Sequence, residues 1–552
     1  MPNRRTFLSQ LAGLGLVPGL HLPRGFYLPP AGKLARPTGA QSLWQDLEVG
    51  MFVHFAPNTW QDKEYDDRST PLSAITPDID TDQWAETAIA LGARYIVLVA
   101  KHAGGFCLWQ TQTTEYGIRN TPWRNGHGDV MESLAASCAA RGLGLGVYLS
   151  PRDDSLGAGL SGVCATPEAQ ERYNGIYRQQ LTELLTRYGS IVELWLDGSS
   201  VVPTGDLVAQ HARGAMVFQG PQATIRWVGT EDGFAPYPCW NSLSARDAGT
   251  GVATALHGDP DGDVWMPVEV DVSIRRPNWF WSTTNEANLL STDALLEIYY
   301  RSVGHGAQLL INMPPDRSGR IPAADAARAK TFGDTVRRRF RTPLAQTGGA
   351  GRQVVLPLVV QQRVDHVILQ EDITVGERVR GWRLEGNAWD KWQLLAEGTA
   401  IGHKLIQPVA PDGYTMLRLT ATRLADEATI RTFAAYNTGE APPATLRDQP
   451  KLWADDAIAS WAGEQIDIDI TPQLTRAGEY RARLVPEGVA AVEVRDASLS
   501  FDGAAQPALA NLAPGRRDVV RLTVPVVGHK VMLRLRLRGA ERGVVLLQRV
   551  AP

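Results

Sequence analysis

Short apolar runs alternate with helix-like segments from about residue 50 to residue 340. The apolar runs are Gly50–Phe55, Arg94–Ala100, Leu145–Leu149, Ile191–Asp197, Ala215–Gln219, Thr224–Gly229, Val264–Val270 and Gln308–Met313. The helix-like segments include Thr81–Gly92, Gly128–Arg141, Thr166–Tyr188 and Thr292–Gly304. Continuously apolar strands separated by helices are typical of a parallel sheet that is buried on both faces.

Eight such strands within about 300 residues predict an α/β fold, a TIM-like (β/α) barrel. A doubly wound open sheet is the alternative. That fold needs a Gly-rich phosphate-binding loop after its first strand, and the sequence FVHFAPNTW at that place is not such a loop. The sequence therefore favours the barrel.

Beyond Phe340 the pattern changes to short segments in which apolar and polar residues alternate. HVILQEDI, RVRGWRLEG and ATIRTFAAYN are examples, and they predict an antiparallel β-sandwich. The Pro- and Gly-containing stretch NTGEAPPATLRDQP resembles a linker or long loop, and IDIDITPQL and KVMLRLRL beyond it predict a second sandwich. We predict a signal and linker over residues 1–40, a barrel over 41–345, and C-terminal β-sandwich domains over 346–437 and 438–552.

The first residues combine a paired arginine with a mild apolar stretch. The sequence MPNRRTFLSQLAGLGLVPGL resembles a bacterial twin-arginine export signal. The first 37 residues carry five Lys or Arg and no acidic residue, so their removal would take the formal net charge from −4 to about −9. We therefore expect a periplasmic or secreted protein. A chance arginine pair in an unstructured N-terminus is the alternative interpretation.

Composition excludes several classes of partner. No basic region suits nucleic acid, and no later run of about 18 apolar residues could span a membrane. The four cysteines, Cys107, Cys138, Cys164 and Cys239, lack the spacing of metal ligands. Because Cys107 and Cys138 lie in a strand-like and a helix-like run, we expect both to be buried free thiols. The sequence does not predict an oligomeric state.

Polar residues follow the predicted strands, where barrel enzymes hold their catalytic groups. His54 and His102 end the first two strands, Tyr148 the third and Asp197 the fourth, while Glu231 follows the strand near 224–229. Two carboxyl groups at one barrel mouth, with aromatic residues and histidines, are typical of a glycoside hydrolase. For Asp197 alone, a loop carboxylate that caps the next helix is the alternative.

The two histidines could instead bind a metal ion. His54 and His102 are 48 residues apart, without HxH or HxxxH spacing and without a third histidine nearby. Contacts between neutral histidines and sugar hydroxyls, or purely structural histidines, are the other interpretations. We therefore predict no metal and no cofactor.

Several motifs in order resemble glycoside hydrolase family 29, the α-L-fucosidases. They are FVHFAPNTW, TPWRNGHGDV, GLGLGVYLSPRD, IVELWLDG, IRWVGTEDG, IRRPNWFW and LLINMPPDRSGRI. The resemblance covers residues 43–335 and continues weakly into 346–437, which is similar to the family's discoidin-like sandwich. TPWRNGHGDV and RWVGTEDG resemble the subfamily that acts on α-1,3/1,4-linked fucose.

The resemblance implies a retaining exo-α-L-fucosidase that releases terminal fucose from oligosaccharides or glycoprotein glycans by double displacement. By position, Asp197 corresponds to the nucleophile and Glu231 to the acid/base. The residues implied in substrate binding are His54, Glu64, His102, Tyr148, Arg226, Trp227, Trp279 and Trp281. On these roles we expect Asp197 to be ionised with a low pKa, and Glu231 to be poorly solvated beside Trp227 and to start protonated.

The chain departs from the family at one position, because many members have two adjacent histidines where this sequence has His102-Ala103. The segment between Asp197 and Glu231 is also short, which leaves Asp232 and Glu193 as alternative acid/base residues. A glycosidase for another sugar, a fucosidase of other linkage preference and a non-catalytic fucose-binding protein are the rival functions. In the predicted sandwich, Trp382, Trp389 and Trp392 could bind carbohydrate, but we expect them to pack in a core.

Overall fold

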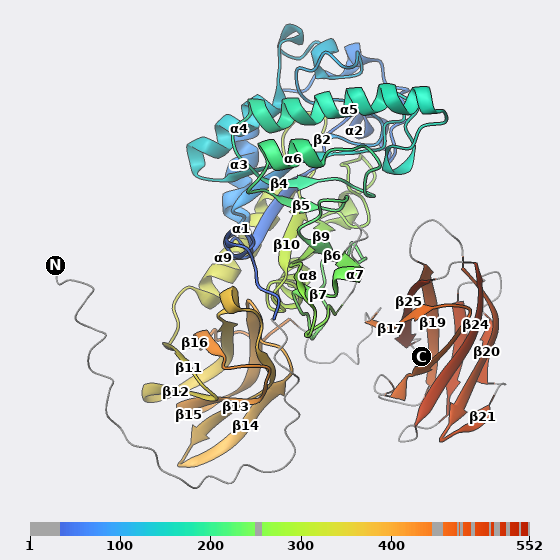
Figure 1. Cartoon of the computed structure of the whole chain (residues 1–552). Coiled ribbons are helices and arrows are strands. Elements are labelled where there is room, and N and C mark those ends of the chain that lie inside the picture. The colour runs from blue at the N-terminus through green and yellow to red at the C-terminus, as the bar shows by residue number, and fades with distance from the viewer. Residues whose placement is uncertain are drawn as a thin grey trace. The chain divides into compact units, whose positions relative to one another are not determined.

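The computed structural model describes residues 34–248 and 257–443, and most of 456–549 in shorter stretches. The barrel strands are β1 (Val49–Val53), β2 (Tyr95–Lys101), β3 (Gly144–Leu149), β4 (Ile191–Trp195), β5 (Met216–Phe218), β6 (Arg226–Trp227), β9 (Val268–Ser273) and β10 (Gln308–Asn312). They form one parallel sheet in the order β5-β4-β3-β2-β1-β10-β9-β6. A parallel bridge between Phe218 and Ile225 links its two ends, so the barrel is nearly closed (Figure 1). The predicted fold class is confirmed.

Helices surround the strands (Figure 1). They are α1 (Gly39–Gln45), α2 (Asn58–Gln61), α3 (Thr81–Leu91), α4 (Val130–Arg141), α5 (Pro167–Arg187), α6 (Gly205–His211), α7 (Ala245–Ala248), α8 (Thr292–Arg301) and α9 (Ala323–Phe340). The four predicted helices are confirmed as α3, α4, α5 and α8. Asp80 caps α3, because its side chain accepts a hydrogen bond from the amide of Gln83.

One predicted strand was placed too early. Val264–Val270 is a mostly apolar run that contains Glu269, but Val264–Trp265 (β8) pairs with Ser242–Leu243 (β7) in a separate two-stranded sheet. The barrel strand β9 begins at Val268 and extends to Ser273. Its register with β10 places Asp271 opposite Leu310 and Ser273 opposite Asn312. The correction carries Asp271 and Ser273 into the barrel.

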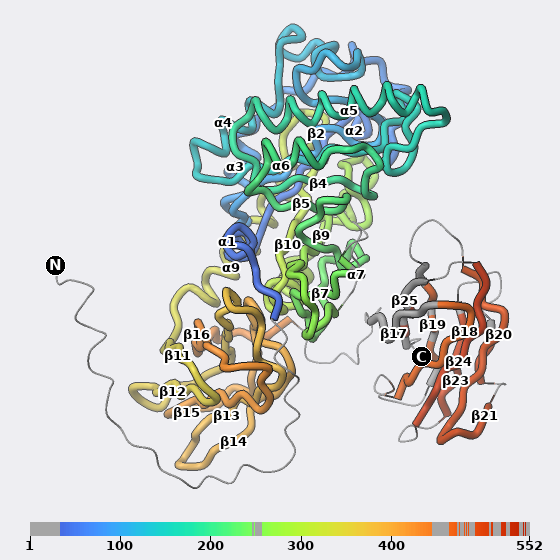
Figure 2. Tube along the Cα trace, in the orientation of Figure 1, coloured from blue at the N-terminus to red at the C-terminus, as the bar shows by residue number. Residues whose placement is uncertain are grey.

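Alternate residues of β1 belong to two different cores. Met51 and Val53 join the large apolar cluster between strands and helices, whereas Phe52 joins an aromatic cluster with Trp195 and Phe218. Strands distant in sequence complete this arrangement, since β1 pairs with β10 as well as with β2. Figure 2 shows β9 and β10, which pair in parallel, side by side. Cys107 and Cys138 are buried free thiols, as expected.

The C-terminal part consists of antiparallel sheets. One contains β11 (Ala345–Ala350), β12 (Gln353–Glu371), β13 (Val379–Ala388), β14 (Lys391–Gly398), β15 (Leu405–Leu424) and β16 (Thr429–Tyr436). A five-stranded sheet contains β17 (Asp456–Ala462), β19 (Gly478–Pro486), β22 (Ala510–Leu512), β23 (Val519–Val524) and β25 (Arg542–Arg549). A four-stranded sheet contains β18 (Gln465–Asp469), β20 (Val492–Phe501), β21 (Ala504–Gln506) and β24 (Val531–Gly539).

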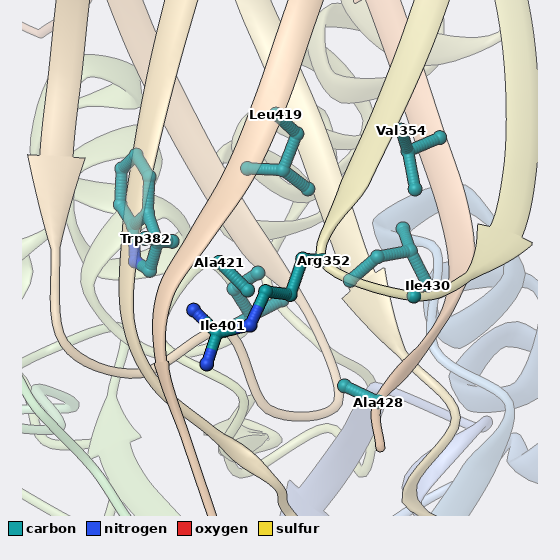
Figure 3. Close-up of a pocket in the computed structure, with 9 residues that line it drawn as sticks. Arg352, Val354, Trp382, Ile401, Leu419, Ala421, Ala428 and Ile430 are labelled. Atoms are coloured by element: carbon teal, nitrogen blue, oxygen red, sulfur yellow. The ribbon is translucent and has the colours of Figure 1, made fainter. Parts of the chain in front are cut away.

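The three tryptophans of the first C-terminal sheet differ in environment. Trp382 is buried, and its indole N–H donates to the Tyr237 hydroxyl and the Ala400 carbonyl at 3.0 Å. Trp389 and Trp392 are 80% and 36% exposed, so the expected core packing is correct for Trp382 and wrong for the other two. A small cavity beside Trp382 is lined by apolar residues and Arg352 (Figure 3). Its free volume of about 10 Å³ holds about one water molecule, not a sugar.

The carboxyl groups of Glu193 and Glu269 lie inside the barrel, and neither residue is exposed to solvent. The indole N–H of Trp195 reaches Glu193 at 2.6 Å and Glu269 at 3.0 Å. Trp44 also donates to Glu193 at 2.7 Å, and Tyr95 to Glu269 at 3.1 Å. Burial, together with the charge of Glu193, raises the pKa of Glu269 well above its usual range. Buried inside the barrel, Glu193 cannot serve as the alternative acid/base.

This pair makes stability depend on pH. The folded-state pKa of Glu269 is raised, so its stabilising effect is complete below the unfolded-state pKa and is lost as pH rises towards the folded value. Between pH 5 and 8 we expect the wild type to lose about 1–3 kcal/mol more unfolding free energy than Glu269→Gln. Denaturant titrations at several pH values measure this, with the exposed Glu171→Gln as control. Parallel losses in wild type and Glu269→Gln would contradict the assignment.

Candidate active site

Four of the predicted residues meet at the C-terminal ends of neighbouring strands. His54 follows β1, His102 follows β2, Tyr148 belongs to β3 and Asp197 follows β4. The ring centroids of His54 and His102 are 6.0 Å apart, and His102 stacks on Tyr148 at 6.0 Å with an interplanar angle of 18°. The Tyr148 hydroxyl donates to Asp197 Oδ2 at 2.9 Å. A continuous series of contacts thus runs from β1 to β4.

Asp197 does not have the low pKa that was expected. The residue is open to solvent at the strand end, but its carboxyl group is closely surrounded by protein. Burial raises its pKa and the negative charge of Glu231 raises it further, whereas the hydrogen bond from Tyr148 lowers it. The low-pKa expectation was wrong because it counted the hydrogen bond and not the desolvation. Tyr148 is therefore the group that favours ionised Asp197.

The hydrogen-bond network fixes the proton of His54. The amide nitrogen of Asn312 donates to Ser273 Oγ at 3.0 Å and to the Trp279 carbonyl at 2.7 Å. Its oxygen must therefore accept from His54 Nδ1, which lies 2.8 Å away. Burial lowers the pKa of His54 to about 3, so the ring is neutral. Nδ1 carries the proton and Nε2 can accept a hydrogen bond.

His102 is also neutral, because burial lowers its pKa to about 4 and the charge of Arg152 acts in the same direction. Its Nδ1 atom is buried and has no hydrogen-bond partner among the described residues. Ala103 is buried, and a Cβ on the next residue, Gly104, would lie 2.6 Å from Asp66. The chain packs tightly here, and Ala103 supplies no polar side chain in place of a second histidine.

Glu231 faces different partners from those expected. Its Oε2 atom accepts from Arg276 Nη1 and from Trp279 Nε1, each at 3.2 Å, and its side chain is 42% exposed. The expected poorly solvated position is therefore wrong. Trp227, the expected neighbour, instead donates its indole N–H to Asp271 at 2.6 Å.

The segment Arg275–Trp281 connects several of these groups. Asn278 Nδ2 and the Trp279 amide each donate to the Glu64 carboxylate at 2.9 Å. Burial raises the pKa of Glu64, and the charge of Glu231 adds to the effect. The Trp279 ring lies 5.0 Å from that of His54. Glu64, His54 and Glu231 are thus all held by contacts with Trp279.

Two predicted residues are not brought into this group. Because side chains alternate along a strand, Arg226 turns away from its neighbour Trp227. It is buried, and its guanidinium donates to the Trp240 carbonyl at 2.7 Å, so the expected contact with substrate is corrected. Trp281 lies under Arg317, whose guanidinium carbon is 5.8 Å from the ring centroid. No ring contact joins Trp281 to the other aromatic residues of the site within the described ranges.

Asp271 is a site residue that the sequence interpretation missed. Burial raises its pKa to about 8, and the charges of Glu231 and Asp197 add to that effect. Its signal was present in the sequence, since Glu269, Asp271 and Ser273 form a polar alternate series in an otherwise apolar strand. The misplaced strand start hid this pattern.

The described residues offer neither a cluster of metal ligands nor a membrane-spanning helix. Among the residues that the structure describes, no three or more His, Cys, Asp or Glu side chains are grouped as metal ligands. None of the described helices is both long and apolar enough to cross a membrane.

Comparison with known proteins decides the family. The sequence model named Alpha-L-fucosidase matches residues 60–339. A rice protein assigned as a putative α-L-fucosidase 1 is 35% identical over an alignment of 472 positions that covers 74% of this chain and 88% of the rice protein. The chain belongs to the α-L-fucosidase family, glycoside hydrolase family 29.

Solved structures of fucosidases agree with this result. A Bacteroides thetaiotaomicron structure assigned as an α-L-fucosidase has a TM-score of 0.69 and 31% identity, covering 73% of this chain and 99% of the other. A glycoside hydrolase 29 structure from a rumen bacterium has a TM-score of 0.66 and 26% identity, covering 93% of this chain and 99% of the other. The likeness to the second structure extends over most of the chain, beyond the barrel.

A buried ion pair anchors the segment Arg275–Trp281 of this fucosidase. Arg275 donates through Nε and Nη2 to Asp325 of α9 at 2.7 and 2.9 Å, and through Nη1 to Asn285 at 3.0 Å. The side chains of Arg275 and Asp325 are 2% and 0% exposed. The root of the segment is therefore fixed to a helix rather than left as a free loop.

Removing one partner tests this anchor. Asp325→Ala leaves a buried, uncompensated guanidinium, and we expect the free energy of unfolding to fall by about 3–5 kcal/mol. Asp334→Ala removes exposed ion pairs with Lys330 and Arg337 on the same helix and serves as the control, with little expected change. Denaturant unfolding measures both variants. Equal stability of Asp325→Ala and the control would contradict the anchoring role.

Proposed function

We propose that the protein is a retaining exo-α-L-fucosidase that hydrolyses terminal α-1,3- and α-1,4-linked fucose from oligosaccharides or glycoconjugates. The observation that carries the proposal is the pairing of Asp197, oriented by Tyr148, with Glu231, held by Arg276 and Trp279. Two carboxyl groups near each other at the strand ends match the needs of double displacement. The linkage preference rests on the resemblance of TPWRNGHGDV and RWVGTEDG to one subfamily.

In the first step, ionised Asp197 attacks the anomeric carbon of fucose. The bond from this carbon to the leaving oxygen breaks, and Glu231 transfers a proton to that oxygen. The Tyr148 hydroxyl keeps Asp197 in the ionised form against the effect of burial. The products of this step are a fucosyl ester on Asp197 and the free aglycone.

In the second step, Glu231 is a carboxylate and takes a proton from a water molecule. The oxygen of this water attacks the anomeric carbon, the ester to Asp197 breaks, and fucose leaves with its α configuration retained. Glu231 is again protonated and Asp197 is again ionised, so the charges balance over the cycle.

Neutral side chains around Asp197 fit the recognition of an uncharged sugar. His54 Nε2 can accept from a sugar hydroxyl because Nδ1 holds the proton. The buried His102 Nδ1 lacks a partner among the described residues, and Glu64 and Tyr148 add polar atoms. Trp279, stacked obliquely near His54, supplies an apolar face for the methyl group of fucose.

Product analysis tests reaction and linkage together. Incubation with α-1,2-, α-1,3-, α-1,4- and α-1,6-fucosylated oligosaccharides should release fucose from the α-1,3 and α-1,4 compounds about tenfold or more faster. Proton NMR of the first product should show the α anomer. A preference for α-1,2 or α-1,6 linkages would contradict the proposed linkage specificity. Release of β-fucose as the first product would contradict a retaining mechanism. Binding without release would indicate a fucose-binding protein.

Two variants separate the carboxyl roles. Asp197→Ala should abolish turnover, and external azide should not restore retention. Glu231→Ala should lose roughly 10²–10⁴-fold in kcat/KM on natural glycans but less on activated aryl fucosides, whose leaving groups need little protonation. Steady-state kinetics on both substrates measure this. Equal losses on the two substrates would remove Glu231 from the acid/base role.

We further propose export to the periplasm or beyond, supported by the paired arginine and apolar stretch of residues 4–20. Arg4→Lys with Arg5→Lys should retain the precursor in the bacterial cytoplasm. Cell fractionation followed by activity assay of each fraction measures this. Unchanged export of the double variant would contradict a twin-arginine signal.

A further inference from the structure

One cation balances a group of carboxyl groups around the strand ends. The carboxyl groups are Asp197, Glu231, Asp232, Asp271 and Glu64. The charge of Glu231 raises the pKa of Asp197, Glu64 and Asp271, so these groups interact electrostatically. In the part of the chain that the structure describes, Arg276 is the only cationic side chain hydrogen-bonded to any member of the group.

Arg276 divides its guanidinium between two neighbouring carboxylates. Nη1 donates to Glu231 Oε2 at 3.2 Å, while Nε and Nη2 donate to Asp232 Oδ1 at 3.1 and 2.9 Å. Trp279 Nε1 donates to the same oxygen of Glu231 at 3.2 Å. Both donors therefore hold Oε2, and Oε1 is the oxygen left for a proton and for the leaving group.

We propose that Arg276 is a positioning residue that sets the orientation and the protonation of Glu231, and that Asp232 moderates it by sharing the guanidinium charge. The inference rests on the proposed function of Glu231 as acid/base. The sequence left Asp232 as an alternative acid/base. The inference gives Asp232 a different role, as the second hydrogen-bond partner of Arg276.

The two reaction steps explain why a shared charge is useful. Glu231 must hold a proton in the first step and be a carboxylate in the second. A guanidinium bound to Glu231 alone would favour the carboxylate and slow the first step. Without the cation, the carboxyl groups of Asp271, Glu64 and Asp232 would favour the protonated form of Glu231 and slow the second step, in which Asp197 is an uncharged ester. Because Arg276 divides its charge between Glu231 and Asp232, it favours the carboxylate of Glu231 less than an undivided ion pair would and more than no cation would.

Variants of Arg276 and Asp232 should therefore have opposite effects. In the pH profile of kcat/KM on a fucosylated oligosaccharide, the alkaline limb reports loss of the acid's proton. Arg276→Gln should move this limb up by about one pH unit, and Asp232→Asn should move it down by a similar amount. Arg276→Lys keeps a positive charge and should stay near the wild-type limb. A merely structural role would lower activity without opposite shifts.

The second step gives an independent readout. With an activated aryl fucoside, Arg276→Gln should release a burst of the aryl alcohol, because the ester on Asp197 then reacts slowly with water. Azide, which needs no general base, should accelerate its turnover. Asp232→Asn should give no burst. These differences separate an effect on Glu231 from a general loss of activity.

The outcomes distinguish the inference from the proposed function. A wild-type enzyme that inverts the anomer, or that shows no fucosidase activity, would overturn the proposed function and the inference with it. An active, retaining wild type whose limb moves in the same direction in both variants, or in neither, would overturn the inference alone. If circular dichroism shows that Arg276→Gln does not fold, Asp232→Asn alone tests the inference. A downward shift of its alkaline limb would support the inference, and an unchanged or raised limb would overturn it. Both variants should also be made in an Asp271→Asn background. If the opposite shifts persist there, the alkaline limb of the pH profile does not report the titration of Asp271.

Discussion

The buried ion pair between Arg275 and Asp325 is the constraint on which the site depends. It fixes the root of the segment Arg275–Trp281 to α9, and every later contact of the segment starts from that fixed point. Trp279 then holds Glu64 through its amide, Asn312 through its carbonyl and Glu231 through its indole N–H. Three backbone or side-chain groups of Trp279 thus position Glu64, which we propose to bind the sugar, the hydrogen-bond network of His54, and the proposed acid/base Glu231.

Strand β9 supplies a second, more deeply buried support. Its alternate residues Glu269, Asp271 and Ser273 each contact a side chain from another strand or strand end, namely Trp195, Trp227 and Asn312. Burial raises the pKa of Glu269 and Asp271. The free energy of unfolding therefore falls as pH rises above the unfolded-state pKa values of these two groups. Trp195 lies two residues before Asp197 and Trp227 four residues before Glu231, so the polar series underlies both proposed catalytic positions.

The sequence predicted the barrel because its parallel strands are continuously apolar, and it predicted the strand ends because polar residues interrupt those runs. It could not place the start of β9, since Val264–Val270 is mostly apolar on both sides of that start and tertiary pairing separates β8 from β9. The 18-residue helix α9 was not predicted, although Ala and Arg, which are strong helix formers, are its most frequent residues. The role of Arg226 was predicted wrongly because its position in a motif does not show in which direction its side chain points. The contact between Arg276 and Glu231 joins residues 45 positions apart, so no local sequence pattern reveals it. The pKa of Asp197 depends on packing density, which is a tertiary property as well.

The central claim is that Asp197 forms a covalent bond with fucose while Glu231 assists. The most direct measurement is to trap the intermediate with a 2-deoxy-2-fluorofucosyl fluoride, whose fluorine slows the second step, and to map the label by peptide mass spectrometry. The account predicts one fluorofucosyl group on the peptide that contains Asp197, with loss of activity in proportion to labelling. A label on Glu231 or Asp271, or continued hydrolysis with inversion and no label, would contradict it.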